Sequence, residues 1–400
     1  MSGSYFQKGF NLKTAVAPVL ERSYHSALVE RIKAANYSVR AGDLTLRLAR
    51  EFGFCYGVDR AVEYAYEAHE KFPNRRLFLS GEIIHNPDVN GRLREMGITI
   101  LGEDDDVELR YREVRPEDVV ILPAFGVTTA QMSYLREKGC VLVDTTCGSV
   151  LNVWKAVRAY ARDGYSSVIH GKHHHEETKA TASQALQEGG HYLCLRDQAE
   201  AASACDFIRG QLSGAGLLRR LSHAMSPGFD PDRHLQSVGL ANQTTMLMSE
   251  SVEIQELLRA AMRERWGEAE LPARFRAFDT ICSATQDRQD AVQTMLARGG
   301  LEVMVVIGGY NSSNTMALAR ICAAKLPTYH ISGPECLEDA AIRFKPIGGQ
   351  AESRAEAWLT AGPVTLGLTA GASTPNNVVG LVVEKILALR GKRADDLVAG

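Results

Sequence analysis

The sequence VLVDTTCGSVLNVWKAVRAYA, at residues 141–161, says more about the architecture of this chain than any other stretch. A short apolar run from Val141 to Val143 predicts a buried strand that ends just before Cys147. After the cysteine, apolar residues recur at the spacing of one helix face: Val150, Val153, Trp154, Val157 and Ala161. Cys147 is therefore expected at a turn between a strand and a helix.

The same pattern occurs twice more in the chain. It surrounds Cys55 in LTLRLAREFGFCYGVDRAVEYAYEA, residues 44–68, and Cys282 in FRAFDTICSATQDRQDAVQTML, residues 275–296. After each cysteine come two more units of strand, loop and helix, at residues 76–90 and 119–135, 165–182 and 238–258, and 301–319 and 364–387. Three homologous α/β modules are therefore predicted, and their uneven spacing excludes a solenoid with a fixed period.

The expected organisation is an N-terminal arm followed by these three modules. The arm covers residues 1–45, and the modules cover 46–147, 148–278 and 279–400. Strands that alternate with helices predict a small, mainly parallel sheet in each module, and such sheets bind ligands beyond the carboxyl ends of their strands. Each module contributes three loops that follow strands, and we expect these nine loops to line one central cleft. The extra length of the middle module, at 217–235, is expected to form a surface loop.

Composition and charge exclude several classes of protein. Of the 400 residues, 45% are hydrophobic and 23% are charged, and 45 Lys and Arg against 48 Asp and Glu give a formal net charge of −3. A near-neutral chain has no basic field for nucleic acid or for an anionic membrane. No apolar run approaches the roughly 18–20 residues that span a bilayer, and no signal peptide is readable, so a cytoplasmic location is expected.

The eight cysteines are too sparse for a disulfide scaffold, and none forms a CxxC pair. Three of them, Cys55, Cys147 and Cys282, recur at one position of the repeat, which favours a shared metal centre over three unrelated core residues. Structural zinc sites use close cysteine pairs and four ligands, so a 4Fe–4S cluster with three thiolate ligands and one open iron fits better. The other five are interpreted as ordinary thiols: Cys140, Cys194, Cys205, Cys322 and Cys336.

Polar and imidazole side chains gather in the remaining loops of the modules. A lone Ser, Thr or Asn before a helix is most often an N-cap. Several helix N-termini with hydroxyl, amide and imidazole donors, aimed at one point, would instead bind a polyanion such as a diphosphate. The loops in question contain His85 and Asn86, residues 173–178, residues 311–314, Thr128 and Thr129, residues 243–245, and Ser373 and Thr374.

The string HHHEET, at residues 173–178, suggests acid catalysis more than zinc binding. It contains no HExxH motif, and adjacent histidines project in different directions. A carboxylic acid beside an imidazole in an apolar cleft can stay protonated and act as a proton donor. Either Glu176 or Glu177 is then the acid, with Thr244 or Thr245 to relay the proton. The alternatives are a zinc-dependent hydrolase and a non-catalytic iron–sulfur sensor, although no basic output helix is visible for a sensor.

Taken together, these loops resemble the 4-hydroxy-3-methylbut-2-enyl diphosphate reductases, the LytB/IspH family of the non-mevalonate isoprenoid pathway. The resemblance runs from about Tyr24 to about Leu389, and several of its strings are similar to the plant and cyanobacterial branch. Its most specific strings are GFCYGVDRAV, EIIHNPDVNGRL, DTTC, HGKHHHEET, ANQTTML, DTICSATQDRQDAV, GGYNSSNT and TAGASTP. The resemblance implies a trefoil of three modules around an iron–sulfur cluster, and reduction of the diphosphate substrate to isopentenyl and dimethylallyl diphosphate.

The resemblance also assigns roles to individual residues. It implies cluster ligands at Cys55, Cys147 and Cys282, the proton donor at Glu177 rather than Glu176, and a substrate-binding, proton-relaying threonine at Thr244 or Thr245. The implied diphosphate ligands are His85, His175, Ser312, Ser313, Asn314 and Ser373. Because no GxGxxG or Walker A motif occurs, electrons are expected from a partner, which the resemblance implies is ferredoxin or flavodoxin.

Two segments depart from the usual family pattern. Phe125 stands in AFGV, where many bacterial members have a histidine, so one diphosphate contact is expected to be absent or replaced. After the second cysteine, CGSVLNVW has Gly148 where a proline is usual and Asn152 where a lysine is common. Neither change affects an expected cluster ligand.

Overall fold

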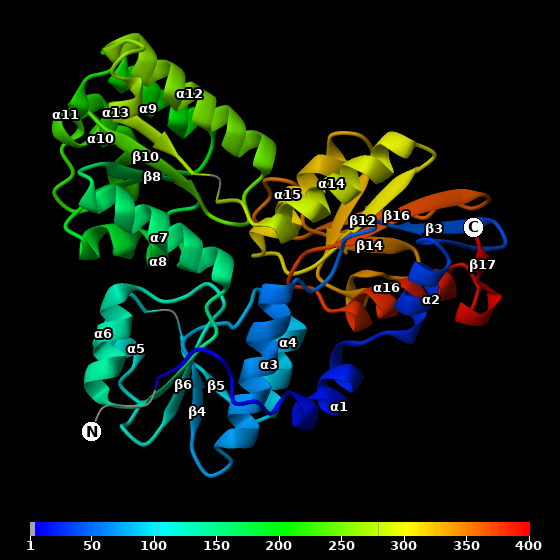
Figure 1. The fold of residues 1–400 in the computed structure, drawn as a ribbon. Coiled ribbons are helices and arrows are strands. Elements are labelled where there is room, and N and C mark those ends of the chain that lie inside the picture. Colours follow the sequence, from blue (N-terminus) through cyan, green and yellow to red (C-terminus); the bar gives the residue numbers. More distant parts are fainter. Residues whose placement is uncertain (1–4, 103, 279) are drawn as a thin grey trace. The chain divides into compact units, whose positions relative to one another are not determined.

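The computed structural model describes residues 5–102, 104–278 and 280–400 (Figure 1). Residues 1–4 of the expected arm, and residue 279, where the third module was expected to begin, lie outside the described part. The chain folds as two compact units. Unit 1 consists of Met1–Lys8, Phe72–Ile83 and Gly97–Cys282, and unit 2 consists of Gly9–Lys71, Ile84–Met96 and Ser283–Gly400.

Unit 1 contains two sheets, and all neighbouring strands in both run parallel. The first sheet has the order β1 (Tyr5–Phe6), β7 (Val141–Asp144), β6 (Val119–Leu122), β4 (Leu77–Leu79) and β5 (Thr99–Ile100). The second has the order β11 (Phe275–Ala277), β10 (Val238–Asn242), β8 (Ser166–His170) and β9 (Tyr192–Leu195). Strands β6, β7, β8 and β10 are buried along their whole length, as parallel strands covered on both faces should be.

Helices connect the strands of unit 1 and cover its sheets. They are α5 (Val107–Arg110), α6 (Thr129–Lys138), α7 (Gly148–Arg162), α8 (Glu176–Gln187), α9 (Gln198–Ile208), α10 (Gly214–Leu221), η1 (Ser222–Ala224), α11 (Pro231–His234), α12 (Met248–Trp266) and α13 (Leu271–Arg274). The largest apolar cluster of this unit joins α9, α10 and α12 to the second sheet. Helices α7 and α8 pack on each other and on β8.

The segment 217–235, expected to be a surface loop, is instead part of the core of unit 1. It folds into the end of α10, η1 and α11. Leu217, Leu221, Met225 and Phe229, spaced four residues apart, are all buried against the second sheet. The expectation was wrong because it relied on the turn-forming Pro, Gly and Asp residues of SPGFDPDRH. The four-residue spacing of the apolar residues was the better indicator of structure here.

Unit 2 contains one larger sheet and a hairpin. The sheet has the order β13 (Thr328–Ile331), β12 (Val303–Ile307), β16 (Val364–Ala370), β3 (Leu44–Leu48), β2 (Ser38–Ala41) and β17 (Val398–Ala399). Its first four strands are parallel, whereas β2 and β17 add antiparallel at the edge. The hairpin pairs β14 (Ala341–Phe344) with β15 (Ser353–Glu356).

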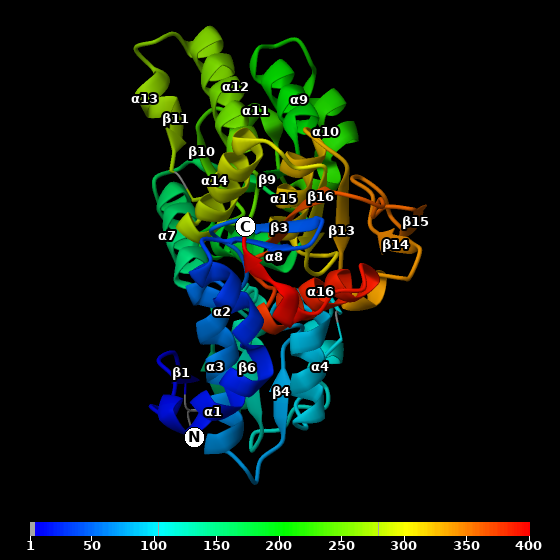
Figure 2. The same ribbon diagram turned by 90° about the vertical axis from the view of Figure 1, so that its right-hand side faces the viewer.

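Helices cover both faces of the sheet in unit 2 (Figures 1 and 2). Val305 and Ile307 of β12 face a cluster formed with α2 and α16, while Met304 and Val306 face α14 and α15. The helices of this unit are α1 (Lys13–Tyr24), α2 (Ala27–Ala34), α3 (Tyr56–Lys71), α4 (Pro87–Glu95), α14 (Ser283–Arg298), α15 (Ser313–Ala323) and α16 (Asn376–Leu389), with short η2 (Pro334–Cys336) and η3 (Ala394–Asp396).

The three sheets repeat one order of four parallel strands, which agrees with the repeat found in the sequence. From the strand that precedes a cysteine, the orders are β7-β6-β4-β5, β11-β10-β8-β9 and β3-β16-β12-β13. The third sheet therefore takes the strand before Cys55 from the beginning of the chain. The boundary expected at residues 45 and 46 cuts through β3, because a strand can join a sheet whose other parallel strands lie more than 250 residues away in sequence.

The N-terminal arm is divided between sheets. Strand β1 pairs with β7, and β2 pairs with β3. Glu67 of α3, only 2% exposed, accepts hydrogen bonds from the backbone N–H groups of Phe10 and Leu12, at 3.0 Å for the latter. In the described residues, no helix has both the length and the apolar character required to cross a bilayer.

Candidate functional site

The three predicted cysteine ligands occupy equivalent positions in three loops. The backbone N–H of Cys55 donates to Ala372 O (3.2 Å), that of Cys147 to Ala124 O (3.0 Å), and that of Cys282 to Thr244 O (3.2 Å). Each acceptor lies two residues beyond the end of the strand next to the cysteine's own: β16, β6 and β10. Each cysteine also lies immediately before a helix: α3, α7 or α14. The sequence repeat therefore reflects a real equivalence of backbone geometry.

The exposure of the cysteines separates the three from the other five. Cys55, Cys147 and Cys282 are half-buried, and the others are buried. Burial raises the pKa of the Cys140 and Cys205 thiols to about 11, and that of Cys322 to about 12. Thiolates are the ligands of iron–sulfur clusters. The donor set of three accessible cysteines before three helices thus fits a thiolate-bound cluster.

Glu177 forms a buried hydrogen-bonded pair with Thr244. The carboxylate is 1% exposed, in the first turn of α8, and Thr244 is 5% exposed, just after β10. The backbone N–H of Thr244 donates to Glu177 Oε1 (2.6 Å), and its hydroxyl donates to Oε2 (3.1 Å). Because the carbonyl of Thr244 accepts from Cys282, this one threonine joins the candidate acid directly to a cysteine loop.

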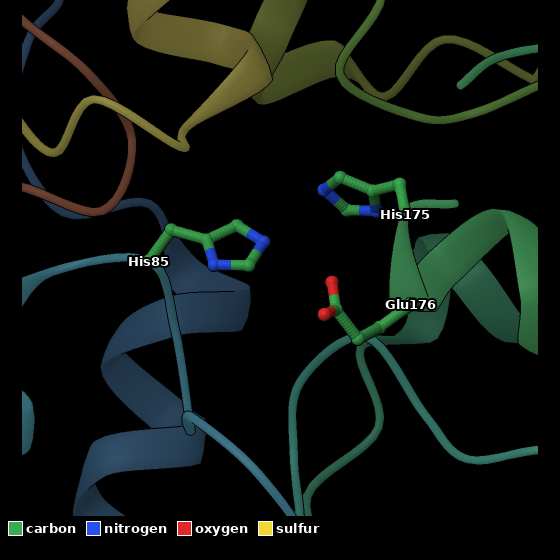
Figure 3. A group of neighbouring side chains, drawn as sticks. All are labelled: His85, His175 and Glu176. Atoms are coloured by element: carbon green, nitrogen blue, oxygen red, sulfur yellow. The ribbon is translucent and has the colours of Figure 1, made fainter. Parts of the chain in front are cut away.

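The structure distinguishes the residues of the two pairs that the sequence left open. Thr245 is half-buried, and its hydroxyl accepts from Gln243 Nε2 (3.0 Å) rather than contacting Glu177. Glu176 is the first residue of α8 (Figure 3). It is also half-buried. Thr244 and Glu177 are therefore the members that pair with each other.

His175 begins α8 and contacts both the candidate acid and Phe125. Its Nδ1 accepts from the backbone N–H of Glu177 (3.2 Å), so the imidazole serves as the N-cap. The ring packs edge-on against Phe125, with 5.5 Å between ring centroids. The imidazole is only 7% exposed, and this packing fixes its plane.

In unit 2, the predicted diphosphate ligands converge from three loops. Ser312 caps α15, and Ser313 is the first residue of that helix. The hydroxyl of Ser373 donates to Ser312 Oγ (3.5 Å) and to the carbonyl of His85 (3.3 Å). At Gly309, an added Cβ would lie 2.4 Å from His85 O, so only glycine permits this approach of the loops. His85, Ser312, Ser313 and Ser373 therefore share one corner of unit 2.

Asn314 has a structural function at this corner. It is 2% exposed, and its Oδ1 accepts from the backbone N–H of Ala372 (2.8 Å) while its Nδ2 donates to Thr285 Oγ1 (3.4 Å). Ala372 is the residue whose carbonyl accepts from Cys55. Asn314 thus connects the start of α15 to the Cys55 loop.

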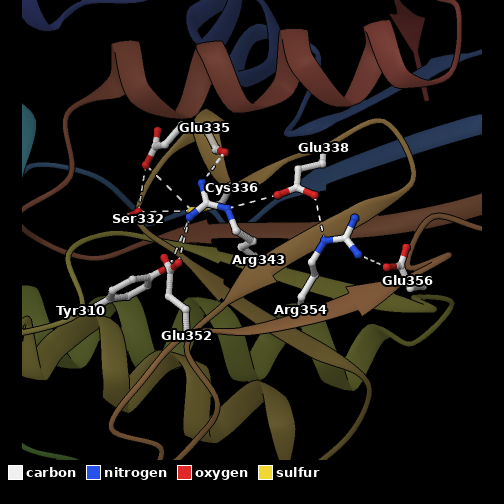
Figure 4. A network of polar contacts seen from close by, with 9 residues as sticks. All are labelled: Tyr310, Ser332, Glu335, Cys336, Glu338, Arg343, Glu352, Arg354 and Glu356. Carbon is white, nitrogen blue, oxygen red and sulfur yellow. Dashed lines mark hydrogen bonds and ion pairs between the residues drawn. The ribbon is translucent and has the colours of Figure 1, made fainter.

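The loop before α15 is also fixed from the side of the β14–β15 hairpin (Figure 4). Tyr310 donates from its hydroxyl to Glu352 Oε1 (2.7 Å), and Arg343 binds the other oxygen of Glu352 (2.8 Å). Lys345 Nζ donates to the carbonyl of Tyr310 (3.4 Å). No local pattern singles out these residues in the sequence, because their partners lie in a hairpin more than 30 residues away.

Comparison with known proteins identifies the family. A family profile described as LytB protein matches residues 46–387. The chain belongs to the LytB family. A relative from Gloeobacter violaceus, named 4-hydroxy-3-methylbut-2-enyl diphosphate reductase, is 47% identical over 98% of this chain and 94% of its own, and one of the same name from Thermosynechococcus vestitus is 45% identical over 97% and 96%.

Solved LytB-type structures have a similar fold. One is the (E)-4-hydroxy-3-methyl-but-2-enyl diphosphate reductase described as the terminal enzyme of the non-mevalonate pathway, which is 26% identical, with a TM-score of 0.52, and covers 85% of this chain and 98% of that one. The corresponding reductase from Plasmodium falciparum is 19% identical, with a TM-score of 0.63, over 86% and 87%. The mixed α/β architecture is thus shared with LytB structures.

The residues that depart from the usual LytB pattern differ in their local environments. Phe125 replaces a possible hydrogen-bonding imidazole with a ring that packs on His175. Gly148 is the first residue of α7, and an added Cβ there would meet nothing within 4 Å, so neither the lost proline nor a side chain is needed for packing. Asn152 is exposed on α7. None of these changes alters the backbone contact of Cys147.

Proposed function

We propose that this chain catalyses the reductive dehydroxylation of 4-hydroxy-3-methylbut-2-enyl diphosphate, the reaction for which its relatives are named. The allylic C–O bond breaks, the substrate takes up two electrons and two protons, and water leaves. The products are isopentenyl diphosphate and dimethylallyl diphosphate. The observation that carries this proposal is the buried Glu177–Thr244 pair, whose threonine is bonded through its carbonyl to the backbone N–H of Cys282.

The cofactor in this proposal is a 4Fe–4S cluster with Cys55, Cys147 and Cys282 as its three protein ligands. Their shared backbone position, partial exposure and placement before helices support the assignment. When bound, such a cluster supplies single electrons and an open iron that acts as a Lewis acid. The electrons come from a protein of the ferredoxin or flavodoxin type.

Glu177 is the proton donor in this proposal. A positioned acid must lie within hydrogen-bond reach of the group that it protonates or of one relay. The Thr244 hydroxyl, 3.1 Å from Glu177 Oε2, provides that relay, and its short side chain holds the hydroxyl in one place. Burial of both groups keeps bulk water from supplying the proton instead.

The diphosphate is held by side chains and helix N-termini. We assign this role to His85, His175, Ser312, Ser313, Asn314 and Ser373, with the N-termini of α8 and α15 adding backbone N–H groups and a favourable dipole. Asn314 already uses its Oδ1 within the protein, so it contributes through the second hydrogen of Nδ2. Fixing the diphosphate positions the distant hydroxyl for reaction.

The proposal is tested by metal and sulfide analysis, electron paramagnetic resonance and turnover assays on anaerobically reconstituted protein. We expect iron and acid-labile sulfide, a spectrum that changes when the diphosphate substrate is added, and both products with dithionite as reductant. Stoichiometric zinc without iron would indicate a hydrolase. Iron with substrate binding but no product under reducing conditions would indicate a sensor, and either result would overturn the proposal.

A further inference from the structure

The Cys55 loop differs from the two other cysteine loops in what fixes it. In unit 1, a threonine lies two residues before the cysteine and binds the last carbonyl of the neighbouring strand. Thr145 donates from its hydroxyl to Leu122 O (2.6 Å), and Thr280 donates from its hydroxyl to Asn242 O (3.1 Å). The equivalent residue before Cys55 is Gly53, which has no side chain to make this bond.

Gly53 could not be replaced by threonine without moving its neighbours. Its φ is +76°, a conformation that residues with a Cβ rarely adopt. An added Cβ would lie 2.7 Å from Asn376 Oδ1 and 3.3 Å from the carbonyl of Thr374. The backbone N–H of Gly53 still reaches Ala370 O (3.3 Å), but the side-chain anchor of the other two loops is absent here.

Arg288 of α14 supplies a different anchor from outside the loop. Its Nη2 donates to Gly53 O (2.7 Å) and to Phe54 O (3.1 Å), and its Nε also donates to Gly53 O (3.2 Å). Its Nη1 donates to Ala284 O (2.7 Å), one turn earlier in the same helix. The guanidinium therefore holds the two residues immediately before Cys55 and fixes them to the helix that follows Cys282.

Arg288 is buried and binds backbone carbonyls rather than a carboxylate, so its function is to hold the backbone in place. The side chain is 4% exposed, and its partners are backbone carbonyls, with no carboxylate at ion-pair distance among the described residues. Burying a cation without a counter-ion costs free energy unless its donors are satisfied. The planar fork satisfies several carbonyls at once, which a lysine ammonium cannot do in the same geometry.

We propose that Arg288 is the positioning residue for Cys55, replacing from α14 the threonine that positions Cys147 and Cys282. The inference rests on the proposed function in assigning Cys55 as a cluster ligand. The inference can be tested without measuring turnover, because Arg288 binds the backbone carbonyls of the two residues before Cys55.

The test uses Arg288→Lys, which keeps the charge and loses the fork. On the metal-free full-length chain, the rate of iodoacetamide alkylation is measured for each cysteine by peptide mass spectrometry. We expect Cys55 to react roughly fivefold to tenfold faster, because losing charged hydrogen bonds loosens the local structure by about that factor. Cys147 and Cys282 serve as internal controls and should change less than about twofold, since distant sites behave independently.

Matched variants and a second measurement complete the experiment. Arg298→Lys, an exposed arginine at the end of α14, should leave all three alkylation rates unchanged. On anaerobically reconstituted protein, Arg288→Lys should lose iron to a chelator faster than wild type, and Arg298→Lys should not. Wild-type protein without iron would refute the proposed function while leaving the alkylation result to decide the role of Arg288.

Three outcomes would overturn the inference about Arg288. The first is an unchanged alkylation rate at Cys55 in Arg288→Lys. The second is equal acceleration at all three cysteines, which would indicate general loosening of the fold. The third is failure of both Arg288→Lys and Arg288→Gln to fold, judged by circular dichroism, which would show that the residue acts on the whole structure.

Discussion

The second and third sheets carry equivalent loops with different chemistry. In the second sheet, the backbone N–H of Thr244 donates to Glu177 (2.6 Å), and in the third, that of Ala372 donates to Asn314 (2.8 Å). Thr244 and Ala372 both lie two residues beyond their strand, and both accept a hydrogen bond from a cysteine N–H. Glu177 is the second residue of α8, and Asn314 is the second residue of α15.

This equivalence shows how one repeated scaffold supports two roles. The repeat needs an oxygen acceptor at the second helix position to hold the loop, and either a carboxylate or an amide meets that need. Only the carboxylate can also carry a proton. In our proposal, the second sheet supplies the acid, and the third, with a neutral amide at the same position, can accept a diphosphate without charge repulsion.

The largest effect is expected from the feature that all three loops share, the cysteine. Cys282→Ser should purify with a damaged or absent cluster and lose nearly all turnover, because serine is a poor ligand for iron in such clusters. The control is Cys140→Ala, which removes a buried thiol of the same unit and should keep its iron. Unchanged iron content in Cys282→Ser would contradict the assignment of three thiolate ligands.

Replacing the acid makes the second sheet resemble the third. Glu177→Gln retains an oxygen that accepts from Thr244 but cannot donate an acidic proton, so kcat should fall by roughly 10²-fold or more. Iron content and substrate binding should stay at wild-type values. Glu176→Gln, one residue away and half-exposed, is the matched control and should change kcat little. Near-normal turnover of Glu177→Gln would remove this residue from the proton-donor role.

Periodicity and repetition were enough to predict the mainly parallel sheets and the strand-to-helix turns at the three cysteines. They could not assign β3 to the third sheet, because pairing between distant segments leaves no local pattern. They also could not separate Thr244 from Thr245, which requires knowing which hydroxyl faces Glu177. Arg288 was equally invisible, since its partners are backbone carbonyls that any sequence provides.

Replacing the amide of Asn314 by a carboxylate, the reverse of Glu177→Gln, should weaken diphosphate binding. Asn314→Asp keeps an oxygen for the Ala372 N–H but places a negative charge beside the proposed diphosphate site, so KM should rise roughly tenfold while kcat changes less. Inhibition by inorganic diphosphate should weaken by a similar factor. An unchanged KM, in a variant with normal iron content, would show that Asn314 lies away from the diphosphate.

The relay hydroxyl should have a smaller effect than the acid. Thr244→Val keeps the side-chain shape and the backbone contacts but removes the hydroxyl, and kcat should fall by about tenfold, as expected for one charge-assisted hydrogen bond. Thr245→Val is the control, because that hydroxyl contacts Gln243 instead. Equal losses in the two variants would contradict the assignment of the relay to Thr244.

The smallest effect at neutral pH concerns one buried histidine in each unit. Burial lowers the pKa of His170 in β8 and of His330 in β13 to about 4, from an ordinary value near 6.5. Both rings are neutral in the folded chain at pH 7. Between pH 6.5 and 4, the unfolded chain binds protons that the folded chain does not, so the free energy of unfolding falls as pH decreases.

Each histidine should lower the free energy of unfolding by roughly 2 kcal/mol between pH 7 and pH 5. The slope is about 1.4 kcal/mol per pH unit below the pKa of the histidine in the unfolded chain. Urea unfolding at the two pH values measures the loss. His170→Asn should remove the part of the pH dependence due to unit 1, and His330→Asn the part due to unit 2. If either variant kept the full wild-type pH dependence, its histidine would have to be protonated in the folded chain, contrary to a ring that is 0% or 3% exposed.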